Sequence, residues 1–482
     1  MFNAISVLSR LLILTFVTSQ IGDMKKILVT TLLFTAALAA FAQQKLPSNF
    51  YLEKLDNGLE VLVIEDNSVP LATVEIVVRN GAYTEDSAFN GLSHLYEHMF
   101  FKANKDIPSQ EEFLKRVNEL GIIFNGTTSD ERVNYFFTLS NKNLMEGLEF
   151  MNSAIRYPLF LEEEMKNENP VVDGEFQRAE SNPYFELFQT FGRKMWGDNY
   201  YRKNPIGLHD VILSATTEKM EIIKNKYYYP NNSMLVVAGD VNHEEVVPMA
   251  EKIFGDWEPS DFDPFERYPI PEFAPLKGET KFLTESENAQ VPLFMIGFHG
   301  PDTRNDLRST YAADVFSYIL QQASSKLQKD LIETGLALQV QVGYQTNKYT
   351  GPIQIILVPN PMNVQAAYDK LWEHINMWND PDYYTDEQLE TAKKLLAIDD
   401  AYSKEATSNF VHTVTYWWAS ATIDYYTNYV ENLKKVTRQD ISKYVNTYIT
   451  DQPHVVGLMI NPSMKATSTF LPWVSKQARN NI

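Results

Sequence analysis

Cysteine is absent from all 482 residues of the chain. Disulfide bonds and thiolate metal sites are therefore excluded, and any zinc ion has to be held by histidine and carboxylate side chains. Histidine is scarce too, with eight in the whole chain. After residue 42 there is no run of about 18 apolar residues, so nothing beyond that point is expected to span a membrane.

The first 42 residues have the composition of a targeting segment. From Met24, the stretch MKKILVTTLLFTAALAAFA has a basic start, a short apolar run and small residues at its end, which predicts a signal peptide cleaved before Gln43. The residues before Met24 are either an artefact of an upstream start codon, which we favour, or part of a longer targeting segment. The sequence therefore predicts an exported protein.

Basic residues are outnumbered by acidic ones. Removing residues 1–42 leaves 39 Lys and Arg against 61 Asp and Glu, a net charge of −22. A surface of that sign repels phosphate backbones, so nucleic acid is not an expected partner. From composition alone, we expect an acidic protein that is exported and soluble.

Hydrophobic residues make up 44% of the chain, enough for two or more packed domains. Alternating apolar residues predict strands at 58–66 and 71–81, and again at 134–140 and 234–241. Residues 91–101 change to the spacing of a helix. Strands and helices are mixed without a regular parallel repeat.

A proline-rich and acidic stretch divides the chain near its middle. Residues 258–280 interrupt every periodicity and are predicted to be a linker. The order of predicted elements after it repeats the order before it, which indicates an internal duplication. We expect an α+β protein of two homologous α/β domains, at 43–257 and 281–482, each with a mixed, largely antiparallel sheet and helices on one face.

The stretch HLYEH at residues 94–98 is typical of a metal site. On a helix, His94 and His98 point the same way, and Glu97 stays near that face. Two such histidines can hold one zinc ion, which leaves the neighbouring glutamate to act on a water molecule. A catalytic site needs a third protein ligand, and the candidate stretch is 164–180, where Glu175 lies in a helix expected to start near Pro170.

HLYEH followed by ENPVVDGE at 168–175 resembles the inverted zinc motif of the pitrilysin/insulinase peptidases, the inverzincins. The resemblance continues through FNGTTSDERVNYFF (124–137) and YYPNNSMLVVAGDV (228–241), and it is clearer in the first half. It implies a zinc-dependent endopeptidase acting on peptides or small unfolded polypeptides. It also implies a chain that forms half of a clamshell.

Carried over residue by residue, the resemblance implies one zinc ion per chain. Its ligands would be His94, His98 and Glu175, with Glu97 as general base and Glu168 as a second catalytic carboxylate supporting the metal site. The family binds substrate as an added strand at a sheet edge. In this chain Asn125 and Gly126 match the substrate-binding Asn-Ala of that edge.

The second half departs from the family pattern. Many active members carry there an arginine and a tyrosine that reach the substrate carbonyl, but this chain has Ile332 and Leu338 at those positions. We therefore expect a homologous partner subunit to supply the pair, in a heterodimer or else a homodimer. Alternatives are substitution by Lys326, Lys329 or Tyr344, or a noncatalytic binding or assembly role in the cell envelope. The expected location is the bacterial periplasm.

Overall fold

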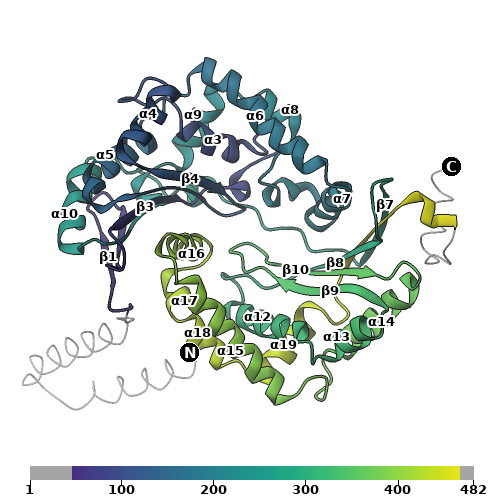
Figure 1. Ribbon diagram of the computed structural model, residues 1–482. Helices are drawn as coiled ribbons and strands as arrows, with labels where there is room; N and C mark the ends of the chain where they lie inside the picture. Colours follow the sequence, from purple (N-terminus) through teal and green to yellow (C-terminus); the bar gives the residue numbers. More distant parts are fainter. Residues whose placement is uncertain (1–45, 467–482) are drawn as a thin grey trace, which may run out of the picture. The chain divides into compact units, whose positions relative to one another are not determined.

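The computed structural model describes residues 46–466, and the predicted signal peptide and upstream segment lie outside this part. Within it, the first half of the chain forms a six-stranded mixed sheet in the order β1-β2-β6-β3-β5-β4, of which Figure 1 labels β1, β3 and β4. Strands β2 and β6 run parallel, and the other neighbouring pairs run antiparallel. The strands are β1 (Phe50–Lys54), β2 (Glu60–Glu65), β3 (Leu71–Val78), β4 (Ile123–Thr128), β5 (Val133–Ser140) and β6 (Ser233–Gly239).

The second half forms a five-stranded sheet in the order β7-β11-β8-β10-β9. Strands β7 and β11 run parallel, and the remaining pairs run antiparallel. The strands are β7 (Glu279–Glu285), β8 (Leu293–His299), β9 (Ala337–Tyr344), β10 (Pro352–Pro359) and β11 (His454–Ile460). With β1 set aside, the two sheets have the same strand order, so the α+β class and the repeated, largely antiparallel sheets predicted from the sequence are confirmed.

Helices of each half cover one face of their own sheet. In the first half, α3, α5 and α10 contact the sheet, and in the second half α12 and α14 do so. The helices of the first half are α3 (Leu92–Phe100), α4 (Gln110–Leu120), α5 (Leu144–Arg156), α6 (Glu162–Glu180), α7 (Phe185–Trp196), α8 (His209–Leu213), α9 (Thr217–Tyr227) and α10 (His243–Phe254). Those of the second half are α12 (Leu307–Gln321), α13 (Lys326–Gln328), α14 (Val364–Met377), α15 (Asp386–Ser403), α16 (Thr407–Ser420), α17 (Ile423–Thr427), α18 (Tyr429–Lys434) and α19 (Arg438–Tyr448).

The other face of each sheet is covered by a helix from the opposite half. Helix α16 packs on β3, β5 and β6, and α7 packs on β7, β8 and β11. The α16 contact is polar, because the buried Glu75 of β3 accepts a hydrogen bond from Thr415 and pairs with His412. The α7 contact is apolar and includes Phe191, Met195 and residues of β7, β8 and β11. This exchange of helices joins the halves from Asn49 onward into one compact unit.

Helix α6 corrects one prediction. The helix was expected to start near Pro170, but it runs from Glu162 to Glu180 with Pro170 inside it. The glutamates at 162–164 favour a start there because their charges complement the positive end of the helix dipole. Pro170 is exposed, so water can reach the carbonyl group that lacks a donor. Glu168 and Glu175 therefore belong to one helix, two turns apart on one face.

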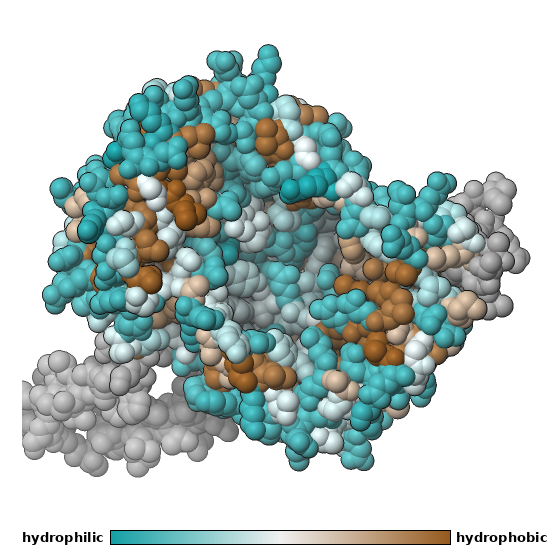
Figure 2. All heavy atoms as spheres, viewed as in Figure 1, coloured by the Kyte–Doolittle hydropathy of each residue, from teal (hydrophilic) through white to brown (hydrophobic). Residues whose placement is uncertain are grey.

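The face of the molecule seen in Figure 2 is mainly hydrophilic, and hydrophobic residues form patches among the hydrophilic ones. Within the described residues, no helix combines the length and the apolar character needed to cross a membrane.

Candidate metal and active site

Helix α3 carries the first three candidate residues. Its amphipathic sequence buries Leu95 and Met99 in the core and turns His94 and His98 to the other side. The helix begins after Gly91, whose φ of 91° is open to glycine but strained for other residues. The buried carboxylate of Glu85 accepts hydrogen bonds from the N–H groups of Gly91 and Ser93, at 2.8 and 2.7 Å. It thereby fixes the start of the helix that bears the histidines.

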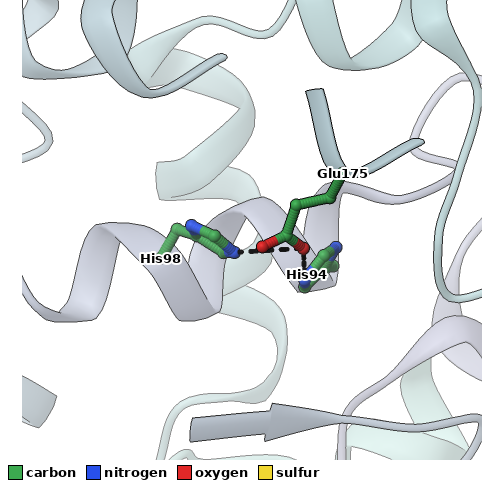
Figure 3. A group of neighbouring side chains, drawn as sticks. All are labelled: His94, His98 and Glu175. Carbon is green, nitrogen blue, oxygen red and sulfur yellow. Dashed lines mark ion pairs between the residues drawn. The ribbon is translucent and has the colours of Figure 1, made fainter. Parts of the chain in front are cut away.

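Glu175 of α6 lies opposite the two histidines (Figure 3). Its Oε2 atom is 3.5 Å from Nε2 of His94 and 4.0 Å from Nε2 of His98. The three groups offer ligand atoms that all lie within 4.8 Å of one another. Among residues 46–466, this is the one group of three or more histidine and acidic side chains close enough to hold a metal ion.

The donor set fits zinc. Two imidazole nitrogens and one carboxylate oxygen are ligands that a catalytic zinc ion takes, with a fourth position left open. Both histidines turn the same nitrogen, Nε2, toward Glu175. The side chains are 15–35% exposed, so the site is shielded but open on one side.

Glu168 orients His98 from the far side of its ring. Its Oε1 atom is 2.8 Å from Nδ1 of His98, and its Oε2 atom pairs with the buried ammonium group of Lys102. A proton on Nδ1 leaves the lone pair of Nε2 facing Glu175. Carboxylates that hold the second nitrogen of a ligand histidine in this way fix its tautomer and raise its basicity.

Burial and neighbouring charges shift the pKa values of three side chains at this site. Burial, together with the nearby charge of His98, lowers the pKa of His94 to about 4, so His94 is neutral at neutral pH. Burial opposes the charge on His98, but the hydrogen bond to Glu168 and nearby carboxylates raise its pKa overall. Burial acts to raise the pKa of Glu168. The hydrogen bonds to His98 and Lys102 outweigh burial, so the pKa of Glu168 is lowered and its carboxylate stays ionised.

Glu97 directly precedes His98 on α3 and is 7% exposed. Its Oε2 atom accepts a hydrogen bond of 2.7 Å from the hydroxyl group of Thr128 on β4. Burial raises the pKa of Glu97, although the Thr128 hydrogen bond acts in the opposite direction. A carboxylate with a raised pKa is a better proton acceptor near neutral pH.

One pocket of about 450 Å³ contains all these groups. Asn125 and Gly126 lie in its wall on β4, the edge strand of the first sheet. The amide N–H of Gly126 donates to the side chain of Asn125 at 2.9 Å. The structure therefore brings all seven candidate residues to one pocket: His94, Glu97, His98, Asn125, Gly126, Glu168 and Glu175.

The lining of this pocket comes entirely from residues 94–175. Ile332 lies in a π-helical turn, Lys329–Glu333, and Leu338 is 56% exposed on β9. Two of the suggested substitutes are engaged elsewhere. Lys326 donates to the carbonyl of Asp382 at 2.8 Å, and Tyr344 donates to that of Pro301 at 3.0 Å.

Sequence reasoning missed several residues of the pocket. Lys102 follows His98 by four residues, and this helical spacing could have indicated that Lys102 lies near the site. Thr128 gave no such signal, because its contact with Glu97 depends on how β4 packs on α3. Phe101, Leu114 and Phe124 form an apolar part of the wall, whereas Phe100 is buried against Tyr135.

Two family models match the chain. "Insulinase (Peptidase family M16)" matches residues 60–208, and "Peptidase M16 inactive domain" matches residues 214–396. An uncharacterized zinc protease of Rickettsia felis is 26% identical over 304 residues, covering 63% of this chain and 71% of that protein. Zinc protease PqqE of Helicobacter pylori is 27% identical over 311 residues, covering 64% and 68%. Human insulin-degrading enzyme is 28% identical over 229 residues, covering 46% of this chain and 22% of that protein.

Solved structures share the fold. A protease from Helicobacter pylori superposes with a TM-score of 0.76 at 22% identity, covering 86% of this chain and all of that one. The periplasmic protease PqqL from Escherichia coli superposes with a TM-score of 0.72 at 15% identity, covering 89% of this chain and 50% of that one.

Proposed function

The chain belongs to the insulinase (pitrilysin) peptidase family, and we propose that it is a zinc-dependent endopeptidase that cleaves peptides or small unfolded polypeptides. The observation that carries this proposal is the convergence of two histidine Nε2 atoms on the Glu175 carboxylate. Glu97 lies on the same helix, one residue before His98. A ligand set and a carboxylate base in one pocket are the parts that metal-assisted hydrolysis requires.

His94, His98 and Glu175 would hold one zinc ion. When bound, zinc acts as a Lewis acid that lowers the pKa of water and polarises a peptide carbonyl. Glu168 keeps His98 in the tautomer whose Nε2 faces the site, and Lys102 neutralises the charge of Glu168. These two residues thus support the ligand set.

Glu97 is the proposed general base. Its buried carboxylate accepts a proton from the attacking water and passes it to the leaving amine nitrogen as the peptide bond breaks. Its raised pKa favours the first transfer without preventing the second.

The substrate is proposed to add as a strand along β4. This strand pairs with β5 on one side and is the edge of its sheet on the other. Main-chain groups at such an edge can pair with an extended peptide of almost any sequence. Asn125 and Gly126 would contact the peptide there, and the apolar wall of Phe101, Leu114 and Phe124 would receive a side chain.

We further propose that a homologous subunit completes the site. No arginine or tyrosine of the described second half lines the pocket, and oxyanion donors of that kind are worth about 3–4 kcal/mol each. The family model matching residues 214–396 describes an inactive domain, and the chain superposes on half of PqqL. Both observations support a chain that works beside a second pair of domains, in a heterodimer or a homodimer.

Mixing this chain with a homologous chain tests whether a second subunit is required for turnover. A homologous chain with arginine and tyrosine at the positions of Ile332 and Leu338 should raise turnover at least about 100-fold. The double variant Ile332→Arg/Leu338→Tyr provides a second test, in which the same pair is added to this chain itself. Full turnover by the unmixed chain, unchanged by the partner, would refute the requirement for a second subunit.

The organisation and location of the chain are proposed from the same family. Domains at 43–257 and 281–482, joined by the linker at 258–280, agree with one sheet in each half, except that β7 begins at Glu279, within the proposed linker. The linker also contains a short helix, α11 (Pro264–Arg267). Export to a periplasm agrees with the shared fold of PqqL, which is a periplasmic protease in Escherichia coli.

Removing the metal tests the proposed function. A quenched fluorescent peptide library should be cleaved by the zinc-loaded chain together with its partner. Cleavage should stop after dialysis against a chelator and return when one equivalent of zinc is restored. Cleavage that persists in the zinc-free protein would rule out the proposed chemistry.

A further inference from the structure

Glu97 is held by the strand proposed to receive the substrate. Strand β4 alternates exposed and partly buried residues, and Phe124, Gly126 and Thr128 form its inner set. This inner set lies toward α3, which contacts β4. The side chain of Glu97 crosses from the helix to the strand and ends at Gly126 and Thr128.

We propose that Thr128 is a positioning residue that fixes the Glu97 carboxylate in its working orientation. This inference rests on the proposed function of Glu97 as general base. The Thr128 hydroxyl donates to Oε2 of Glu97 at 2.7 Å, and it lies 3.5 Å from the carbonyl oxygen of Ser93. The backbone of Thr128 also contributes a hydrogen bond to Glu97, and in the described part of the chain no residue other than Thr128 hydrogen-bonds this carboxylate.

Gly126 supplies the space for this arrangement. A Cβ atom at residue 126 would stand 2.7 Å from both Cγ and Oε1 of Glu97, closer than real Cβ contacts. The Glu97 side chain therefore packs against Gly126 and is hydrogen-bonded to Thr128, two residues further along the same face of β4. Because a glutamate has three rotatable side-chain bonds, removing the Thr128 hydroxyl takes away one of the contacts that hold the carboxylate in a single orientation.

Strand β4 also sets the register of the proposed substrate strand. The outward residues Asn125 and Thr127 stand beside the free edge, and Phe124 anchors the strand through ring contacts with Phe101 and Phe113, at 4.9 and 5.9 Å. A peptide added to this edge takes its register from β4, and so does Glu97. Strand β4 thus contacts both the carboxylate of Glu97 and the proposed peptide.

Two substitutions at Thr128 test the proposal. Thr128→Val removes the hydroxyl group but keeps a β-branched side chain of similar shape. Its kcat should fall about 10- to 100-fold, as for other residues that orient a catalytic group, whereas KM and zinc affinity should change less than about twofold. Thr128→Ser keeps the hydroxyl group and should recover kcat to within about threefold of the wild type. Thr138→Val, on β5 and outside the pocket, is the matched control.

A structural readout separates this inference from the proposed function. Crystal structures should show one Glu97 conformer in the wild type and in Thr128→Ser, and a turned or divided one in Thr128→Val. A single unchanged conformer in Thr128→Val, or an unchanged kcat, would overturn the positioning role. A zinc-loaded wild type that cleaves nothing with its partner, yet shows these conformers, would overturn the proposed function alone.

Discussion

The Nδ1 atom of His98 lies 2.8 Å from Oε1 of Glu168, and the other oxygen of that carboxylate pairs with Lys102. Lys102 is buried, so water has too little access to its ammonium group to replace the Glu168 carboxylate. The chain of contacts from Lys102 to His98 therefore links a buried cation to the proposed metal ligand.

Breaking this link should weaken metal binding. We expect Glu168→Gln and Lys102→Met each to lower zinc affinity about 10- to 100-fold, because His98 loses its fixed tautomer. Competition with a chromophoric chelator measures the affinity. The exposed Lys115→Met, which removes a charge paired with Glu112, is the control and should leave affinity unchanged. Equal affinities in all variants would show that the Glu168 contact does not support the site.

Glu85 predicts a pH dependence of stability. Burial raises its pKa to about 8, against the opposing hydrogen bonds from Gly91 and Ser93. The unfolded chain has the ordinary value near 4.5, so the folded protein binds this proton more tightly. The free energy of unfolding, relative to Glu85→Gln, should therefore be largest below about pH 4.5 and fall as the pH rises to about 8.

Urea denaturation of the wild type and Glu85→Gln, between pH 4.5 and 8.5, measures this difference. Because the glutamine does not titrate, the remaining pH dependence of both proteins cancels. A difference that stays constant or grows with pH would contradict the raised pKa.

Arg132 joins the two halves of the protein. It donates to the carbonyl of His412 and to the hydroxyl of Thr415, both at 2.5 Å. Burial lowers the pKa of Arg132, and the nearby Glu75 acts in the opposite direction by favouring the charged guanidinium. Arg132→Met should lower the free energy of unfolding by about 2–4 kcal/mol, because buried acceptors lose their donor. Denaturant titration measures this. Arg116→Met, an exposed control, should change it by less than about 0.5 kcal/mol, and equal effects would refute the buried role.

The sequence allowed the local part of the site to be predicted, and tertiary contacts explain what it did not show. The spacing of His94 and His98 predicts a shared helix face from helical geometry alone. Glu175 required a family resemblance, since 77 residues separate it from His98. The true start of α6 was missed because proline was taken to begin the helix, although its exposed position lets the helix continue.

Long-range packing was likewise out of reach. The repeated element order indicated two similar halves, but the exchange of α7 and α16 between the sheets depends on burial that only the folded chain shows. The same holds for Thr128, whose residue type is common in strands and whose role depends on the approach of β4 to α3.

The most direct test of the account compares the wild type with Glu97→Gln at matched zinc content, each with the partner subunit present, on a quenched fluorescent peptide library. Both proteins should bind one equivalent of zinc, since Glu97 lies outside the ligand set. The wild type should cleave peptides, and the variant should lose at least about 100-fold in turnover. Equal turnover by the two proteins, or none by either, would contradict an endopeptidase that uses Glu97 as its base.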